Sequence, residues 1–235
     1  MIQLHAALFL ALLASSVLAV EVDRASARIV DGTNSFRADE NRPPVKSNGE
    51  LAHAARDFAA YMARTGRYGH TADNRTPSER AQAAGYAYCV VAENIAYQYR
   101  STGFPGAGEL AQAFVQGWID SPKHRANLVD GNLTEIGVGV ARDEKGRYFA
   151  VQLFGRPRSA AIRFEVENHG PEAVRYRFGE RRFTLGPRQR RAHTVCSPTR
   201  LQIVGPAGRL PFSALAVDGK RYTIRGGEVA PESVR

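Results

Sequence analysis

Histidine and glutamate side chains are the groups in this sequence that could do chemistry, because the common catalytic signatures are absent. The chain has no G-x-S-x-G nucleophile elbow, no H-E-x-x-H zinc motif, no phosphate-binding loop and no C-x-x-C pair. Gly137-Val138-Gly139 begins like a dinucleotide fingerprint, but it lacks the third glycine and falls inside an expected strand. Any reaction would therefore rest on imidazoles and carboxylates that the fold brings together.

The candidate residues are His70, Glu79, Glu93 and His124. Each has an ordinary local explanation. Glu79 follows Thr76 by three residues, which is the spacing of a helix capping box. His124 falls near the third position of a helix that starts at a serine-proline pair, where side chains normally reach the surface. His70 lies in a polar loop, and Glu93 follows an apolar run. Taken one at a time, these residues do not define a shared site.

The elements that must position these residues follow from hydrophobic periodicity and from helix-start and turn signals. The expected helices are 29–38, 49–65, 76–84, 109–119 and 121–128, and the expected strands are 86–97, 133–141 and 147–154. The helix over 49–65 is the clearest, because apolar residues recur on one face from Leu51 to Met62 and Gly66 ends it. The strands 133–141 and 147–154 flank a short polar turn, which predicts a β-hairpin.

The pattern of apolar and polar residues changes after Gly155. Residues 156–158 are typical of a linker, and the short alternating apolar runs that follow carry no helical period. Turn residues separate these runs, which predicts a small all-β domain over 160–228 and a frayed tail over 231–235.

Net charge is distributed unevenly along the chain. Residues 21–155 hold 16 Lys and Arg against 16 Asp and Glu, whereas residues 156–235 hold 16 against 7, which is the whole net charge of +9. The basic all-β domain is therefore expected to be either a solvated, arginine-rich surface or an anchor for an anionic surface, such as acidic polysaccharide, phosphorylated glycolipid or anionic lipid head groups. Nucleic acid is not expected as a partner, because an exported protein rarely meets it.

The first residues have the character of a signal peptide. Residues 1–20 hold no Lys, Arg, Asp or Glu, the run from Ala6 to Ala14 has the length of an h-region, and cleavage is expected near Ala19. Export would place the mature chain in an oxidising compartment, either secreted or periplasmic. There Cys89 and Cys196 are either bridged or remain as two buried thiols.

Several motifs together resemble one family. They are Tyr68-Gly69-His70-Thr71 with Thr76-Pro77-Ser78-Glu79-Arg80, Glu93-Asn94-Ile95-Ala96, Gly117-Trp118 through Leu128, and Glu135 through Val140 ending in Gln152-Leu153-Phe154-Gly155. In this order they resemble the CAP superfamily of cysteine-rich secretory, antigen 5 and pathogenesis-related proteins, and most of all its bacterial SCP-like extracellular branch. The resemblance covers residues 29–155. The cysteine framework of the animal members is missing.

The resemblance implies an α+β fold: an α-β-α sandwich with an antiparallel sheet, here followed by the all-β domain. It also implies that His70, Glu79, Glu93 and His124 converge in a surface cleft. Two imidazoles and two carboxylates would suit Zn²⁺ or another divalent cation, or could act as a general acid/base pair. No nucleophile commits this site to a reaction, since Ser121 is expected as a helix cap and Tyr97 as a core aromatic.

Three functions remain open. The leading one is a secreted, monomeric binding module whose cleft takes a small apolar ligand of the lipid or sterol kind, which the resemblance suggests, or a cell-envelope polymer. The second is a metal-assisted hydrolase acting on peptide or envelope substrate. The third is an adhesion module in which the four residues have lost their role.

Overall fold

The structure of the protein is a computed structural model that describes residues 2–205, 209, 211–226 and 228–233, with the side chains of residues 2–20 left aside. The chain divides into two compact units, Met1–Pro157 and Arg158–Arg235. The pattern of apolar residues in the sequence changes close to this boundary.

The first unit contains five helices and four strands in its described part. The helices are α1 Ile2–Asp39, α2 Gly49–Thr65, α3 Pro77–Ala83, α4 Ala107–Ile119 and α5 Pro122–Val129. The strands are β1 Lys46–Ser47, β2 Tyr88–Gln98, β3 Glu135–Arg142 and β4 Tyr148–Pro157, which form one sheet in the order β1-β3-β4-β2. The expected hairpin is confirmed as β3 and β4, which pair antiparallel.

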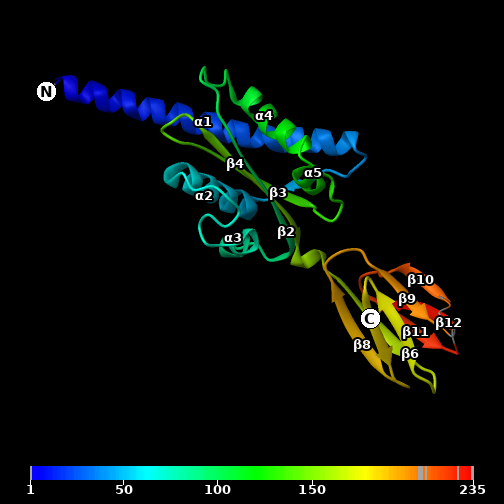
Figure 1. The fold of residues 1–235 in the computed structure, drawn as a ribbon. Helices are drawn as coiled ribbons and strands as arrows, with labels where there is room; N and C mark the ends of the chain where they lie inside the picture. The colour runs from blue at the N-terminus through cyan, green and yellow to red at the C-terminus, as the bar shows by residue number, and fades with distance from the viewer. Residues whose placement is uncertain (1, 206–208, 210, 227, 234–235) are drawn as a thin grey trace. The chain divides into compact units, whose positions relative to one another are not determined.

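Helices cover both faces of this sheet (Figure 1). Helices α1, α4 and α5 lie on one side, while α2 and α3 lie on the other. Strand alternation gives each face its own core. Ile136, Val138 and Val140 of β3 pack in the cluster under α1 and α4. Phe149 and Val151 of β4 pack in the cluster under α2. The expected α-β-α sandwich is therefore the observed architecture, and β2 is one edge of its sheet.

Two glycines on β3 allow α2 to lie directly on the sheet. An ideal Cβ on Gly137 would stand 2.1 Å from the backbone nitrogen of Ala52, and one on Gly139 would stand 2.2 Å from that of Arg56. Both distances are far inside van der Waals contact, so no side chain fits between strand and helix. The motif that resembled the start of a dinucleotide fingerprint is a packing device between β3 and α2.

Three expectations about element boundaries are wrong. The short helix expected at 29–38 is the last part of the much longer α1, and the predicted signal peptide, residues 1–19, lies where side chains are not described. The expected linker at 156–158 is occupied by the end of β4, whose pairing with β2 continues to Pro157. Part of the expected tail is strand β12 Glu228–Ser233, because its backbone pairs with β11 Lys220–Arg225.

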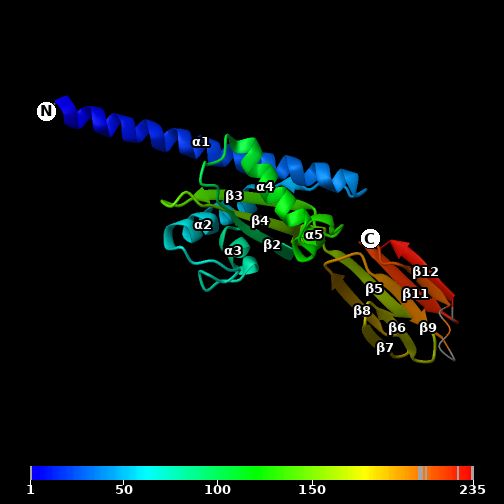
Figure 2. The same cartoon turned by 45° about the horizontal axis from the view of Figure 1, so that its top comes forward.

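The second unit is the expected all-β domain (Figure 2). A short 3₁₀ helix, Arg158–Ala160, leads into two four-stranded sheets. One sheet, in the order β10-β9-β6-β7, contains Phe212–Leu215, Arg200–Val204, Val174–Phe178 and Arg181–Leu185. The other, in the order β12-β11-β5-β8, contains Glu228–Ser233, Lys220–Arg225, Ile162–Asn168 and Arg190–Val195. Inward residues of both sheets form one hydrophobic cluster.

An imidazole stands inside this aromatic cluster. His193 Nε2 and the Tyr176 hydroxyl are hydrogen-bonded at 2.7 Å. The ring of His193 lies 5.2 Å from that of Phe164 and 4.9 Å from that of Phe183, measured between centroids. Burial lowers the pKa of His193 to about 4, with a further contribution from the positive charge of Arg191. The neutral imidazole is therefore the form that the folded domain accommodates.

The all-β domain is expected to lose stability as the pH falls from about 6.5 to about 4. The unfolded His193 takes up a proton near pH 6.5, whereas the folded one does so only near pH 4, so acid favours the unfolded state. The loss attributable to this group is at most about 3 kcal/mol. Urea unfolding of His193→Gln across this pH range should show a shallower pH dependence than the wild type. An equal slope in both proteins would contradict the assignment, and His53→Gln serves as an exposed-histidine control.

Both cysteines of the chain, Cys89 and Cys196, are disulfide-bonded, and neither is a free thiol. The alternative of two buried free thiols is therefore wrong. Among the residues whose side chains are described, no helix has the length and apolar character needed to cross a membrane.

Candidate functional site

The centre of the site is a buried carboxylate on the edge strand β2. Glu93 is 6 % exposed, and its side chain is 1 % exposed. Its two oxygens have different partners. Oε2 accepts a hydrogen bond from Arg80 Nη2 at 2.7 Å, and Oε1 lies 2.8 Å from His70 Nδ1. The carboxylate is thus held between a guanidinium and an imidazole, which compensate the cost of burying its charge.

Arg80 is the residue that connects this site to the fold. Its side chain comes from α3, is 5 % exposed, and lies 3.6 Å above the centre of the Phe58 ring. Besides Glu93, its guanidinium donates to Asp73 Oδ1 at 2.8 Å, and to the backbone oxygens of Arg75 at 2.8 Å and His70 at 2.9 Å. These bonds fix the loop that carries His70, so Arg80 positions both the carboxylate and the imidazole.

Sequence reasoning did not select Arg80 as a site residue, although it lies in a motif that the resemblance used. The sequence contains only a weak signal that Arg80 is buried. Arginine is almost never buried without a partner, but nothing in the spacing shows that position 80 faces inward. The burial of Arg80 follows from how α3 docks on β2, which is a tertiary property.

His70 is the exposed member of the pair. Its side chain is 53 % exposed, so the ring reaches solvent while Nδ1 is held by Glu93. The hydrogen bond to Glu93 raises the pKa of His70, and its partial burial and the nearby Arg80 charge oppose this rise. Within the described part of the chain no other group hydrogen-bonds its Nε2, which is therefore the atom available to a ligand or proton.

His124 approaches from the other helical layer. It occupies the third position of α5, as expected, and is half-buried. Burial lowers the pKa of His124, and the charge of His70 lowers it further, which places the two imidazoles within electrostatic reach of each other. Asn94 donates to the backbone oxygen of His124 at 3.2 Å, and Asn127 of α5 donates to Asn94 Oδ1 at 2.9 Å. These amides join α5 to the edge strand.

Glu79 is directed elsewhere. Its Oε2 accepts from the Thr76 backbone N–H at 2.7 Å and from the Thr76 hydroxyl at 2.8 Å, and the Thr76 hydroxyl in turn accepts from the Glu79 N–H. This reciprocal pair is the capping box expected from the spacing, and it starts α3. The hydrogen bonds from Thr76 lower the pKa of the exposed Glu79. The structure thus brings His70 and Glu93 together, brings His124 near them, and uses Glu79 as a cap.

Exposed tyrosines lie beside the buried carboxylate. Tyr68 and Tyr97 are 49 % and 52 % exposed and meet edge to face, with ring centroids 5.4 Å apart. The Tyr68 hydroxyl donates to the backbone oxygen of Ile95, two residues beyond Glu93. Burial and the charge of Glu93 both raise the pKa of Tyr68. The expectation that Tyr97 is a core aromatic is wrong. β2 is an edge strand of the sheet, and about half of this side chain is exposed to solvent.

Ser121 is expected to cap helix α5, and the structure confirms its position but not a capping hydrogen bond. It occupies the N-cap position of α5, but its side chain makes no capping hydrogen bond. The start of α5 relies instead on the proline at its first position and on the backbone bond from Arg125 N–H to the Ser121 oxygen at 2.8 Å.

The raised pKa of His70 is expected to depend on Glu93. The Glu93→Gln variant removes the charge that stabilises the imidazolium, so the pKa of His70 should fall toward or below its ordinary value. In the wild type this pair stabilises the fold fully below pH about 6.5 and loses that contribution as the pH rises through the raised pKa. An NMR titration of the histidine Hε1 resonances measures the change. The resonance of His53, which pairs with Asp57, is the internal control, and an unmoved His70 pKa would contradict the assignment.

A four-ligand metal site does not fit this arrangement. Both oxygens of Glu93 are engaged, and a cation bound to them would lie beside the positive charge of Arg80. Within the described residues, no three or more His, Cys, Asp and Glu side chains are placed to hold one ion. Glu93 orients the ring of His70 through Nδ1 and leaves its Nε2 unengaged by the carboxylate.

The geometry defines an α-β-α sandwich domain that carries a histidine–carboxylate pair on the edge strand of its sheet, supported by a buried arginine. The family model described as "CAP: Cysteine-rich secretory protein family" matches residues 30–154, which is more than half of the chain. The chain therefore belongs to the CAP family, and its all-β domain lies outside the matched range.

Individual relatives are distant. The uncharacterized protein YkwD of Bacillus subtilis (strain 168) is 27 % identical over 130 residues, which are 55 % of this chain and 46 % of the relative. Among solved structures, an extracellular SCP-domain protein from Bacillus anthracis is 28 % identical with a TM-score of 0.47, covering 56 % of this chain and 40 % of its own. An outer surface protein of Borrelia burgdorferi is 19 % identical with a TM-score of 0.48, covering 55 % and 90 %. The chain thus spans less than half the length of the two Bacillus proteins.

Proposed function

We propose that this CAP-family chain is a secreted or periplasmic binding protein whose CAP domain recognises a cell-envelope polymer at the edge of β2. The observation that carries the proposal is the exposed Tyr68–Tyr97 pair beside the charged His70–Glu93–Arg80 group. Aromatic rings next to a fixed hydrogen-bonding group are typical of recognition surfaces, because the rings supply contact area and the polar group supplies orientation.

An envelope polymer suits this surface better than a small apolar ligand. The tyrosine side chains are about half exposed, as is that of His70. An apolar molecule of lipid or sterol kind gains most from a concave, largely enclosed pocket. An extended polymer with polar groups can lie across an open surface and use rings and imidazole together.

Two features support an extracytoplasmic location. The apolar, uncharged first twenty residues have the pattern of a signal peptide. The disulfide-bonded state of both cysteines is the state that proteins keep in oxidising compartments.

Binding to purified bacterial cell-wall sacculi tests the proposal. The full chain is sedimented with sacculi, and the Tyr68→Ala/Tyr97→Ala double variant is expected to bind about tenfold more weakly, since each aromatic contact contributes about 0.5–1.5 kcal/mol. His70→Ala should also weaken binding. His53→Ala is the matched control, because His53 is 59 % exposed and pairs with Asp57 as His70 pairs with Glu93. Equal sedimentation of all these proteins would refute the proposal.

A divalent cation is a possible addition to this site and not a requirement for it. When bound, the cation would act as a Lewis acid toward a polar ligand group. His70 and His124 would hold it, with Glu93 fixing the ring of His70. Calorimetric titration with Zn²⁺ should detect weak binding that His70→Ala abolishes and His53→Ala leaves unchanged. Zn²⁺ binding that is the same in both variants would place any cation elsewhere.

The hydrolase alternative has one specific observation in its favour. The hydrogen bond to Glu93 raises the pKa of His70 and burial lowers that of His124, which suits one imidazole to act as an acid and the other as a base. The described residues around them include no activated nucleophile, since Ser121 is at a helix cap and Tyr97 is an exposed ring. Release of soluble fragments from sacculi, lost in His124→Ala, would support this alternative over binding alone.

A further inference from the structure

The two outer faces of the all-β domain differ in charge, although both are rich in arginine. Strand alternation and register place one set of side chains on the solvent side of each sheet. On the β12-β11-β5-β8 sheet the outward charged residues are Arg163, Arg190, Arg221, Arg225, Glu165, Glu167, Glu228 and Glu232. Positive and negative charges are equal in number there.

Two of the four arginines on that face form ion pairs with its glutamates. Arg221 Nε donates to Glu165 Oε2 at 2.8 Å and lies 3.5 Å from Glu167 Oε2. Arg190 lies 3.7 Å from the same Glu165 oxygen. Surface pairs of this kind neutralise the local field and leave little charge for a partner.

The other outer face, which we call the arginine face, has no such compensation. Its outward residues are Arg175 and Arg177 of β6, Arg182 and Thr184 of β7, Arg200, Gln202 and Val204 of β9, and Ser213 and Leu215 of β10. None of these outward positions holds an acidic residue. Within the described part of the chain, none of the four arginines forms an ion pair.

The arrangement of these arginines is unfavourable for the isolated domain. Arg177 and Arg182 stand directly opposite each other on neighbouring strands, where like charges destabilise a sheet. Arg175 is two residues from Arg177 on the same side of β6, which is a separation of about 7 Å. The charges therefore spread over an area in two directions, which suits a ligand with several anionic groups.

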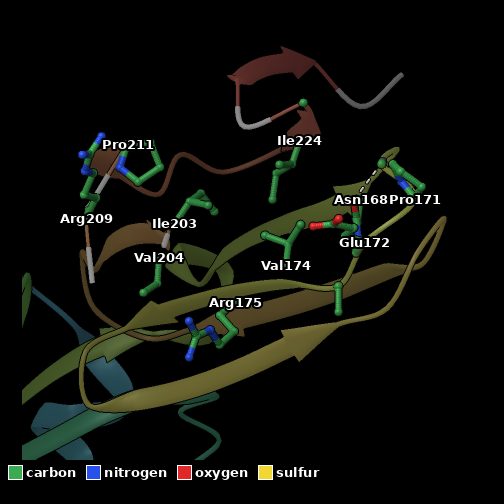
Figure 3. Close-up of a pocket in the computed structure, with 14 residues that line it drawn as sticks. Asn168, Pro171, Glu172, Val174, Arg175, Ile203, Val204, Arg209, Pro211 and Ile224 are labelled. Carbon is green, nitrogen blue, oxygen red and sulfur yellow. Dashed lines mark hydrogen bonds between the residues drawn. The ribbon is translucent and has the colours of Figure 1, made fainter. Parts of the chain in front are cut away.

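The arginine face also contains a hollow. A groove of about 360 Å³ is lined by Arg175, Arg177, Arg182, Thr184 and Val204, with Tyr176 and Phe183. Arg175 and Val204 also line a larger cavity of about 730 Å³ at the end of the domain, shown in Figure 3. The groove, unlike that larger cavity, lies wholly on strands of the arginine face.

We propose that the arginine face binds an acidic polysaccharide through its carboxylate groups. Guanidinium groups match carboxylates with two parallel hydrogen bonds. Thr184, Gln202 and Ser213 lie among the arginines and offer hydrogen bonds to sugar hydroxyls, and Arg177 Nε already donates to Gln202 Oε1 at 2.7 Å. Among the described outward residues of the arginine face, only Val204 and Leu215 are apolar, which gives little area for insertion into a membrane.

This site is separate from the edge of β2, and the two can be tested independently. The probe is polygalacturonate, a soluble carboxylate polymer, with neutral dextran as the uncharged control. The full chain is expected to bind polygalacturonate and not dextran, and binding should weaken steeply from 50 to 200 mM salt because exposed charges are screened over about 8–10 Å.

Two triple variants with the same change in net charge test the location. Arg175→Gln/Arg182→Gln/Arg200→Gln removes three charges from the arginine face and should weaken polygalacturonate binding about tenfold or more. Arg163→Gln/Arg190→Gln/Arg225→Gln removes three charges from the opposite face and should stay within about twofold of the wild type. Circular dichroism and thermal unfolding verify that both variants are folded.

Three results would overturn the inference. An equal loss in the two triple variants would mean that only net charge matters. Tighter binding to phosphatidylglycerol vesicles or to duplex DNA than to polygalacturonate would identify another class of partner. Loss of polygalacturonate binding in His70→Ala would place the interaction at the CAP-domain site. Retention in His70→Ala, with loss in the first triple variant, supports the arginine face whatever the outcome for sacculi.

Discussion

Gly137→Ala is expected to lower the free energy of unfolding of the CAP domain by more than the ~1–3 kcal/mol typical of an overpacked core. The added methyl group would stand 2.1 Å from the Ala52 nitrogen and 2.2 Å from the Leu51 carbonyl carbon. These are backbone atoms of α2, which cannot rotate away as a side chain could. The helix would have to move off β3, which would open the cluster that holds Leu51 and Phe58.

Thermal or urea unfolding measures this effect, and Gly139→Ala should behave in the same way because its Cβ would meet the backbone at Arg56. Gly108→Ala is the matched control. Gly108 lies in the first turns of α4 and has open space around an added Cβ, so alanine should be neutral or slightly stabilising there. A stable, fully folded Gly137→Ala protein would show that α2 does not pack against β3 in this way.

The second large effect is expected for Arg80→Met. Removing the guanidinium leaves Glu93 buried with no cation on its Oε2 side, and breaking a buried ion pair from one side costs about 3–5 kcal/mol. The loop with His70 also loses the bond to its backbone oxygen. We therefore expect a lower unfolding free energy together with weaker binding at the edge of β2, even though Arg80 itself is 5 % exposed.

A double variant separates charge from packing. In Arg80→Met/Glu93→Gln neither charge remains, so the loss should be clearly smaller than the sum of the two single losses. Arg80→Lys keeps the charge but cannot serve Glu93, Asp73 and two carbonyl oxygens from one planar group, and an intermediate loss is expected. Additive losses in the double variant would contradict the coupling between Arg80 and Glu93.

The site therefore depends on the buried Arg80–Glu93 pair for its shape and on exposed groups for its contacts. Glu93 is fixed by its position on β2, and it holds His70 with Nδ1 toward the protein and Nε2 toward solvent. Substitution of the exposed Tyr97 should change binding with little change in stability. Substitutions of Arg80 should change both, which distinguishes a positioning residue from a contact residue.

Much of the secondary structure could be predicted from the sequence because it depends on local signals. The helix over 49–65 follows from its apolar spacing and from Gly66, which adopts a φ of 68° at its end. The capping box of α3 follows from Thr76 and Glu79, which interact across three residues and need nothing from the rest of the fold. The all-β character of residues after 157 follows from alternation of apolar and polar residues, and the excess of arginine there is a matter of composition.

Contacts between distant segments needed the tertiary structure. Thr76 and Glu79 form their hydrogen bonds with each other. The family pattern groups Glu79 with His70, but it does not reveal that the Glu79 side chain turns back to Thr76. The burial of Arg80, the exposure of Tyr97 and the two-sided use of the Glu93 carboxylate depend on how α3 docks on the edge strand β2. The sequence also did not show that two arginines of one outer face pair with glutamates, whereas those of the other face have no acidic neighbour. Both faces alternate alike along the chain, and only the pairing of strands brings Glu165 to Arg221. Local sequence determines an element when its signals lie within a few residues, whereas burial and charge pairing are decided by segments that meet only after folding.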